Sequence, residues 1–201
     1  MKTLRRPGSD RFFVMNTLLQ WRSCIRSTCC LRVALGAVLA HGLLECGNAY
    51  GQTSASPIHY VWASGGNVSP YTNWDNAATT IQAAVNAAHT NDTVLIRAGT
   101  YRGSGNRMIL LNGKDLVLRA ETDESPVIDC EDNADGIRLY FGSTTNTVID
   151  GLTIVNSGGA INLSRSSATI RHCLITSNRY ATGISASDAS EVVIEDCVII
   201  N

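Results

Sequence analysis

The chain has 201 residues, of which 44% are hydrophobic, 16% charged and 6% aromatic, which suits one folded domain with a sizeable core. Its net charge of −1 hides an asymmetry: residues 1–51 carry seven basic and two acidic residues (net +5), whereas residues 52–201 carry nine and fifteen (net −6). An acidic main part without a lysine or arginine cluster excludes a nucleic-acid-binding protein, and no apolar run reaches the ~18 residues needed to span a bilayer.

The first fifty residues have the order of a secretory signal. A mostly apolar stretch, VALGAVLAHGLL from Val33 to Leu44, follows three arginines and precedes the small residues CGNAYG. Cleavage is expected before Tyr50 or two residues later, and translation starts at Met1 or Met15. We therefore expect residues 1–51 to be a leader and the protein to be secreted or held in the cell envelope; a buried helix is the alternative interpretation.

Removing the leader leaves three of the seven cysteines, Cys130, Cys173 and Cys197. An odd number of cysteines argues against a disulfide scaffold. Neither a CxxC motif nor a zinc-type spacing of cysteine and histidine occurs in residues 52–201, so we expect no structural metal.

Residues 52–91 read as an N-terminal cap. His59 to Ala63 alternates like a strand, and the segment SGGNVSPYTN is rich in turn residues. A helix is then predicted from Thr79 to Ala88, because Thr79-x-x-Gln82 has the spacing of a capping box and apolar residues recur at helical spacing.

From Asp92 to Asn201 the hydrophobic period changes to two, and short strands repeat every 22–31 residues. Three sets of positions keep the same order in each repeat. The first is a small residue preceded by a polar or charged one: Ala98, Ala120, Gly151, Cys173 and Cys197. The second is an apolar pair: Ile109, Ile137, Ile161 and Ile184, each followed two residues later by Leu111, Leu139, Leu163 and Ala186. The third is Asn156 and Asn178.

A repeat of this length with three short strands predicts an all-β fold, a right-handed parallel β-helix over 92–201 with a short capping helix at its N-terminal end. Like residues then lie above one another at ~4.8 Å, so that Asn156 is expected over Asn178 and Cys173 beside Cys197 without a disulfide. Leucine-rich repeats are excluded because LxxLxLxxN is absent, and helical repeats because the 3.6-residue period is absent. The longest repeat is expected to place its extra residues in EDNAD or FGSTTN.

Over roughly residues 58–201 the chain resembles right-handed parallel β-helix proteins of the pectin-lyase fold, of the exported bacterial type. The resemblance is carried by YVWASGG, TTIQAAVNAAHTNDTVLIRAGTY, NGKDLVLRA, VIDGLTIVN and TIRHCLITSN. It implies the fold but no single activity, because the group includes pectate lyases, polygalacturonases, other polysaccharide enzymes and adhesin-like solenoids.

The motifs expected of the enzymes in that group are absent. Residues 52–201 lack Arg-x-Pro-x-x-Arg, Asn-Thr-Asp, Gly-His-Gly and Arg-Ile-Lys, and they contain one lysine, Lys114. Calcium is expected only if the protein is a lyase, which needs carboxylates on neighbouring coils beside a basic side chain. The acidic segment Glu131 to Gly136 lacks the spacing of an EF-hand and is interpreted as a surface loop.

The candidate catalytic residues are Asp150, His172 and Asp196, which share the corner position of three consecutive repeats. One coil per ~4.8 Å places the two carboxylates roughly 10 Å apart with the imidazole between them, near the wide limit for an inverting glycosidase. A solvated turn is the alternative, because the same column continues with Arg97 and Arg119, which share no catalytic role with the aspartates and the histidine. Separately, three cap aromatics are interpreted either as a sugar-stacking platform or as packing at the end of the coil: Trp62, Tyr71 and Trp74.

Two functions remain open at this point. One is an exported β-helix that binds a polysaccharide or cell-surface glycan, as a surface scaffold without catalysis. The other is the N-terminal part of a polysaccharide lyase or glycoside hydrolase. The second is kept because Cys197 to Asn201 reads as a strand without a following cap, which suggests a truncated chain. We do not expect this chain alone to degrade pectate or other uronic-acid polymers.

Overall fold

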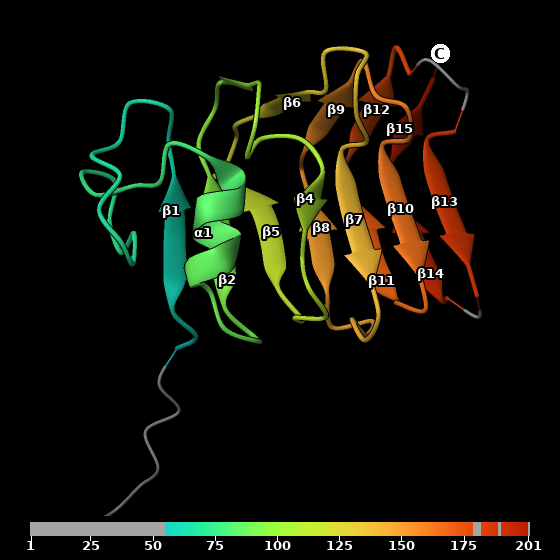
Figure 1. Ribbon diagram of the computed structural model, residues 1–201, viewed down its shortest axis with the longest axis horizontal. Coiled ribbons are helices and arrows are strands. Elements are labelled where there is room, and N and C mark those ends of the chain that lie inside the picture. The colour runs from blue at the N-terminus through green and yellow to red at the C-terminus, as the bar shows by residue number, and fades with distance from the viewer. Residues whose placement is uncertain (1–54, 179–181, 189, 201) are drawn as a thin grey trace, which may run out of the picture. The chain divides into compact units, whose positions relative to one another are not determined.

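The computed structural model describes residues 55–178, 182–188 and 190–200, which form a parallel β-solenoid with one short helix (Figure 1). The expected leader at 1–51 and the terminal Asn201 lie outside these residues. Sheet A contains β1 (Ile58–Val61), β2 (Thr93–Ile96), β5 (Val117–Ala120), β8 (Val148–Asp150), β11 (Ala168–Arg171) and β14 (Val192–Glu195). Sheet B contains β3 (Thr100–Tyr101), β6 (Val127–Asp129), β9 (Thr153–Val155), β12 (Leu174–Thr176) and β15 (Val198–Ile199). Sheet C contains β4 (Ile109–Leu110), β7 (Ile137–Tyr140), β10 (Ile161–Ser164) and β13 (Ile184–Ser187).

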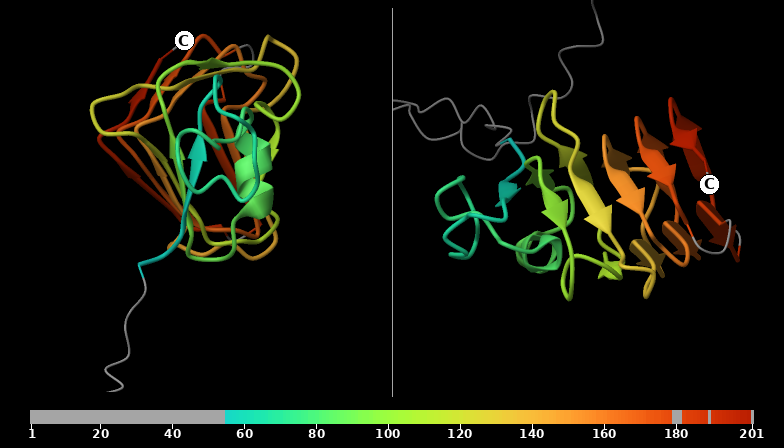
Figure 2. Two further views of the ribbon diagram at one scale, coloured as in Figure 1. Left: turned by 90° about the vertical axis from the view of Figure 1, so that its left-hand side faces the viewer. Right: turned by 90° about the horizontal axis from the view of Figure 1, so that it is seen from above.

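The predicted parallel β-helix is confirmed. Each full coil contributes one strand to sheet A, one to sheet B and one to sheet C, and the paired strands run parallel. Seen end-on, the three sheets surround a common interior (Figure 2). Strands of two to four residues are too short to be stable alone, so each depends on the coils above and below it.

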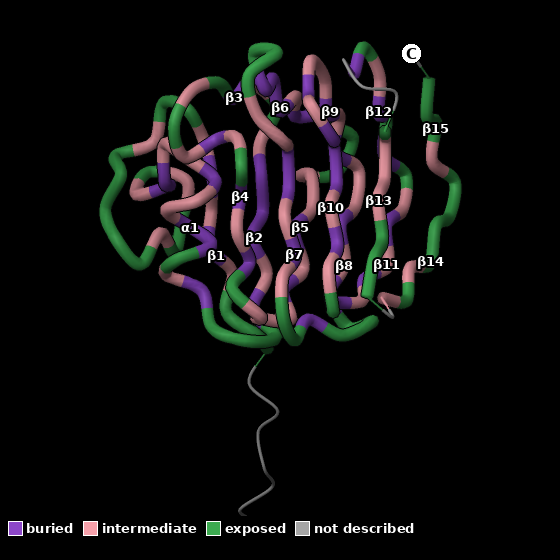
Figure 3. Tube along the Cα trace, turned by 45° about the vertical axis from the view of Figure 1, so that its right-hand side comes forward, coloured by how far each residue is buried: buried purple, intermediate pink, exposed green. Residues whose placement is uncertain are grey.

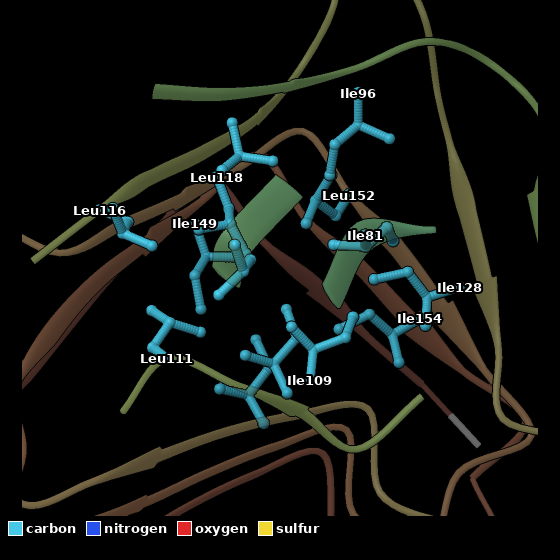
Figure 4. Packing of buried hydrophobic residues seen from close by; sticks show 14 of the residues in the cluster. Ile81, Ile96, Ile109, Leu111, Leu116, Leu118, Ile128, Ile149, Leu152 and Ile154 are labelled. Atoms are coloured by element: carbon cyan, nitrogen blue, oxygen red, sulfur yellow. The ribbon is translucent and has the colours of Figure 1, made fainter. Parts of the chain in front are cut away.

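The interior is built from columns of aliphatic side chains. In sheet C the predicted pairs stack as expected: Ile109, Ile137 and Ile161 form one column, and Leu139 lies over Leu163. Sheet A adds Val94, Leu118, Ile149 and Ile170, and sheet B adds Tyr101, Ile128, Ile154 and Ile175. These side chains are all nearly inaccessible to solvent. Buried positions recur along the strands in Figure 3, and Figure 4 shows the packing of Leu118, Ile149 and Ile154. Burying each one contributes about 1.5–3 kcal/mol relative to leaving it exposed.

The register of sheet A differs from the sequence-based alignment in the first coil. Thr93 pairs with Val117 and Ile96 with Ala120, so Ala98 does not lie over Ala120, and Arg97 does not lie over Arg119. The cause is the length of the first coil: Ile96 and its register partner Ala120 are 24 residues apart, whereas the sequence-based alignment assumed 22. Ala98 therefore lies in the turn that follows β2, whereas Ala120 is the last residue of β5.

The predicted stack of Asn156 on Asn178 is wrong. Thr176 pairs with Val155, which places Ser177 beside Asn156 and Asn178 beside Ser157. The Asn178 side chain accepts hydrogen bonds from the backbone N–H (3.1 Å) and the hydroxyl of Ser157. Asn156 instead donates to the Asp129 carboxylate at 2.9 Å.

The extra residues of the longest repeat are spread over three turns. The expected segments EDNAD and FGSTTN lie in the turns that follow β6 and β7, and a third long turn, residues 121–126, connects β5 to β6. The corresponding turn after β8 has two residues. Added length is therefore accommodated outside the stacked strands.

The cysteine prediction is confirmed. The pairing of Leu174 with Val198 places Cys173 beside Cys197, and the three cysteines of the described residues are free thiols. Cys130 and Cys173 are buried, and burial raises the pKa of each thiol to about 12.

The capping helix exists but begins later than predicted. Helix α1 spans Ile81–Ala87, with Thr80 at its N-cap, so the capping box from Thr79 is wrong. The backbone N–H of Ile81 is satisfied instead by the side-chain oxygen of Asn106 at 2.9 Å. At the other end the ammonium of Lys114 donates to three backbone carbonyls, those of Val85, Asn86 and Ala88 at 2.8–3.2 Å.

The Gln82 side chain closes the free edge of sheet C. Its Oε1 accepts from the Leu110 N–H at 2.8 Å, and its Nε2 donates to the Leu110 carbonyl at 3.1 Å. Gln82 therefore supplies the two hydrogen bonds that a preceding strand would make with β4. The role of Gln82 is therefore to pair with Leu110 and not to form a capping box with Thr79.

The edge of sheet A is covered by the loop between β1 and α1. The Tyr60 N–H donates to Tyr71 (2.7 Å), and the Trp62 N–H donates to Ala78 (2.9 Å). The Arg97 guanidinium lies over the rings of Trp62 and Trp74, with its Cζ 5.1 and 4.0 Å from the ring centroids. Trp62, Tyr71 and Trp74 are each partly buried, and Tyr71 packs against the core, which favours the packing interpretation of these aromatics over a sugar-stacking platform.

We predict that Gln82→Ala lowers the free energy of unfolding by about 1–3 kcal/mol, because it leaves the N–H and carbonyl of Leu110 unpaired. Chemical denaturation of the full chain measures this. The control is Thr90→Ala, an exposed change in the turn that follows the same helix, which should shift the free energy by less than about 0.5 kcal/mol. Equal effects of the two substitutions would contradict the edge-closing role of Gln82.

Candidate functional site

The corner between sheets A and B holds the three residues predicted from the sequence. Asp150 ends β8, and its register partner on the next coil is Arg171, not His172. His172 follows one position later and lies beside Gly151, with Asp196 as its neighbour on the following coil. The expected single column is therefore wrong by one residue, because the repeat between Asp150 and its register partner has 21 residues where 22 were assumed.

The side chains nevertheless meet. His172 Nδ1 lies 2.8 Å from Asp150 Oδ1, and its Nε2 lies 3.8 Å from Asp196 Oδ2. Arg171 binds the other oxygen of Asp150, with both Nε and Nη2 at 2.9 Å. The imidazole thus lies between two carboxylates, as expected, with one of them also paired to a guanidinium.

The backbone explains the corner. Gly151, His172 and Asp196 have φ values of 72°, 51° and 49°, in the left-handed region that glycine and short polar residues tolerate best. One left-handed residue turns the chain from sheet A into sheet B. A corner position that requires this conformation accounts for a polar or glycine residue there without any catalytic role.

The electrostatics of the corner favour an ion pair. Burial alone would raise the pKa of Asp150, but hydrogen bonds from His172 and Arg171 and the positive charge of Arg171 outweigh it and lower the pKa below its usual value. Asp150 is therefore ionised at neutral pH. Its side chain is 19% exposed, whereas those of His172 and Asp196 are 57% and 83% exposed. A histidine oriented by a carboxylate is the arrangement of a general base, but here it lies on an open surface.

The acidic loop considered for calcium is occupied by basic side chains. In this segment Glu131 pairs with Arg107 at 2.5 Å, and Asp135 pairs with Arg138 at 2.6 Å. Within the described ranges, no three histidine, cysteine or acidic side chains are placed to bind one metal ion.

The outer face of sheet C carries two adjoining hollows; this sheet faces the viewer in Figure 1. One, of about 470 Å³, is lined by residues of α1, β4 and the loop between β3 and β4, including Gln82, Asn86, Arg107 and Met108. The second, of about 390 Å³, is lined by Leu110, Asn112, Arg138, Tyr140 and Phe141. Leu110 and Asn112 line both, so the hollows form one groove across β4 and β7, called here the sheet C groove.

Aromatic and cationic side chains form one end of the sheet C groove. Phe141 is 67% exposed, and its ring centroid lies 6.4 Å from that of Tyr140. Arg138 lies over Tyr140 at 6.0 Å, and Arg165 of the next coil lies over Phe141 at 5.7 Å. The guanidinium of Arg138 also pairs with Asp135 at 2.6 Å. These contacts hold the two rings at the surface without burying Phe141.

Sequence reasoning missed this face, although its signal was present. The segment IRLYF places Ile137 and Leu139 in the interior column, so the alternation of a strand directs Arg138 and Tyr140 outward.

Comparison with known proteins identifies the fold family. The family model described as "right handed beta helix region" matches residues 84–201, more than half of the chain. The chain belongs to the right-handed β-helix family. No curated protein and no solved structure matches this β-helix significantly. None of its helices in the described ranges is long and apolar enough to cross a membrane.

We predict that Asp150→Asn lowers the free energy of unfolding at pH 7 by about 1 kcal/mol, because it removes the charge that binds Arg171 and His172. The lowered pKa of Asp150 means that this stabilisation is present above the ordinary aspartate pKa of about 3.9 and is lost as pH falls through the folded-state value. Urea unfolding between pH 7 and pH 2.5 should show the difference shrinking below about pH 4.

The control for this prediction is Asp123→Asn, an exposed change in the turn between β5 and β6, where asparagine also tolerates the left-handed backbone (φ 62°). It should leave the free energy of unfolding nearly unchanged at every pH. A difference for Asp150→Asn that stays constant from pH 7 to pH 2.5 would contradict the ion-pair interpretation.

Proposed function

We propose that this β-helix is an exported protein that binds a neutral glycan in the sheet C groove, as a binding or surface scaffold without catalysis by the described residues. The observation that carries the proposal is the pair of rings at one end of the sheet C groove. Phe141 exposes 67% of its surface and lines one hollow together with Tyr140 and Leu110, so that apolar side chains adjoin there and do not stand singly. The C–H face of a sugar ring packs well on such a surface.

The polar lining of the groove supports the same ligand. Gln82, Asn86 and Asn112 present amide groups beside the apolar side chains of Met108 and Leu110. Hydroxyl groups of a sugar can donate to and accept from amides, and a few polar groups among apolar ones are typical of preformed ligand sites. The combined size of the two hollows exceeds 300 Å³, the lower end of the usual range for such sites.

The charges of the groove favour a neutral glycan over a uronic-acid polymer. Arg107 and Arg138, the two arginines that line the groove, are paired with Glu131 and Asp135, whereas Arg165 lies outside the lining, over the ring of Phe141. To bind these guanidinium groups, a polyuronate would have to displace their carboxylate partners; otherwise its own carboxylates would be repelled by those partners. Lys114 supplies no charge to the groove, because its ammonium binds the carbonyls at the end of α1.

The test is a binding screen of the full chain against neutral and uronic-acid oligosaccharides by calorimetry, followed by substitution of the aromatic rings. We expect binding to a neutral oligosaccharide that weakens about fivefold to tenfold in Phe141→Ala and in Tyr140→Ala, because each loses a stacking surface. Val68→Ala, at an exposed apolar residue of the cap loop, is the matched control and should bind like the unmodified chain. Binding that is indifferent to both aromatic substitutions would refute the sheet C groove as the site.

The second candidate function, a polysaccharide lyase or hydrolase, is favoured only by the 2.8 Å contact between His172 and Asp150. We expect no unsaturated product from pectate with or without calcium and no new reducing ends, because that pair stands on an open surface away from the sheet C groove. Absorbance and reducing-sugar assays measure this. Product formation that disappears in His172→Ala would establish the enzyme instead.

A further inference from the structure

Five large side chains stand on a backbone conformation that suits smaller ones. In the described part of the chain, fifteen residues other than glycine have a φ between 49° and 74°. Ten of them are four asparagines, four aspartates, one histidine and one serine. Asparagine, aspartate and histidine are enriched in this left-handed region, where the Cβ of most residues comes too close to the following carbonyl oxygen. The other five are larger: Tyr71, Met108, Glu131, Phe141 and Arg165.

Four of these five larger residues gather at the sheet C groove. Met108 and Phe141 line its two hollows and are 42% and 67% exposed. Arg165 lies over the ring of Phe141, and Glu131 binds Arg107, another residue of the lining. The remaining one, in the cap loop, packs against the core. Strained backbone conformations cluster at binding and active sites in proteins, so their concentration here points to a function of this surface.

The turn from sheet C to sheet A separates what the fold requires from what it does not. Gly113, Phe141, Arg165 and Asp188 occupy this turn in four successive coils, with φ values of 73°, 58°, 50° and 55°. A Cβ on Gly113 would lie 2.7 Å from the carbonyl oxygen of Phe141, so the turns stack closely. The fold therefore requires a left-handed residue in each coil, and a glycine and an aspartate supply it at the two ends of the row. The phenylalanine and the arginine between them are unfavourable choices for the turn itself.

Arg165 also differs from the arginines that line the groove. Within residues 55–178, 182–188 and 190–200, no carboxylate pairs with Arg165, whose guanidinium lies 5.7 Å from the ring centroid of Phe141. Its N–H groups are therefore available to the hydroxyl oxygens of a sugar that packs on the same ring. At the other end of the groove, the unbranched thioether side chain of Met108 offers an apolar surface that adapts to a ligand.

We propose that Met108 and Arg165 bind the glycan together with Phe141, so that the site extends from the loop before β4 to the turn after β10 and is kept at a cost in stability. This inference rests on the proposed function, because it names further residues of the same site. It adds that the ligand contacts three successive coils, with apolar contacts at Met108 and Phe141 and hydrogen bonds from Arg165.

The first test asks whether the three side chains are unfavourable for folding. Asparagine tolerates the left-handed region and alanine does not, so the two variants at one position differ chiefly in the cost of the backbone. By chemical denaturation of the full chain, we expect the unfolding equilibrium constant of Phe141→Asn to be about fivefold smaller than that of Phe141→Ala. The same difference is expected between the asparagine and alanine variants of Met108 and of Arg165.

The control for the first test is Thr145, an exposed residue of the turn between β7 and β8 without a left-handed φ. Thr145→Asn and Thr145→Ala should agree within about twofold in the unfolding equilibrium constant. Asparagine and alanine variants that are equally stable at all three groove positions would overturn the claim that the site is kept at a cost in stability.

The second test measures binding of cello-, xylo- and manno-oligosaccharides by calorimetry. We expect Met108→Ala and Arg165→Gln each to weaken the affinity about threefold to tenfold, because one removes apolar contact and the other removes charge-assisted donors. The matched controls are Val68→Ala, in the exposed part of the cap loop, and Arg119→Gln, on the outer face of sheet A. Both should bind like the unmodified chain.

The outcomes distinguish this inference from the proposed function. Phe141→Asn should bind weakly although it is more stable than Phe141→Ala, which a purely structural role of the ring does not predict. If Phe141→Ala weakens binding while Met108→Ala and Arg165→Gln do not, the groove is the site but its extension is refuted. If none of the neutral oligosaccharides binds, the proposed function is refuted and the glycan contacts of Met108 and Arg165 are refuted with it.

Discussion

Stacking of like residues in successive coils is the constraint on which the rest of the structure depends. No strand of two to four residues has enough hydrogen bonds or buried area to persist alone, so an interior isoleucine in one coil is stabilised by the isoleucine above it. The Ile109, Ile137 and Ile161 column shows the rule at its simplest, with each member essentially inaccessible to solvent. Once that column is in register, the outward positions of the same strands also form rows.

Within the part of the chain that the structure describes, no coil precedes β1 and β4, and the cap makes the contacts that such a coil would have made. Gln82 replaces the hydrogen bonds of a missing strand along β4, and the covering loop does the same along β1. Leaving these edges open would expose unpaired N–H and carbonyl groups that template association with other chains. Helix α1 adds apolar side chains over the interior, and Lys114 satisfies the carbonyls at its end.

The sequence predicted correctly which residues lie above one another within the strands of sheet C, but not which residues face each other at the turns. Periodicity two and the repeated Ile-x-Leu pairs were sufficient to predict the fold and the sheet C columns, because these positions are read within one strand. The corner was misaligned at Arg97 and His172, since one residue more or less in a turn changes which residues face each other. The 3.0 Å contact between His59 and Asp92 could not be predicted for another reason: the two residues are 33 positions apart in the chain, and only the folded cap brings them together. The exposed ring of Phe141 carried no periodic signal at all.

The unequal turns have a consequence for how such a protein can change over time. Residues 121–126 and the segments after β6 and β7 lengthen the outline of the coil while Val117 still pairs with Val148 and Val127 with Thr153. Insertions in these turns are therefore nearly neutral for the stack, since lengthening a loop costs little free energy. The segments after β6 and β7 flank β7 of sheet C, so a change of their length would alter the surroundings of the sheet C groove without moving the interior columns. In this chain, the residues that shape the outer surface are therefore different from the residues that maintain the stack.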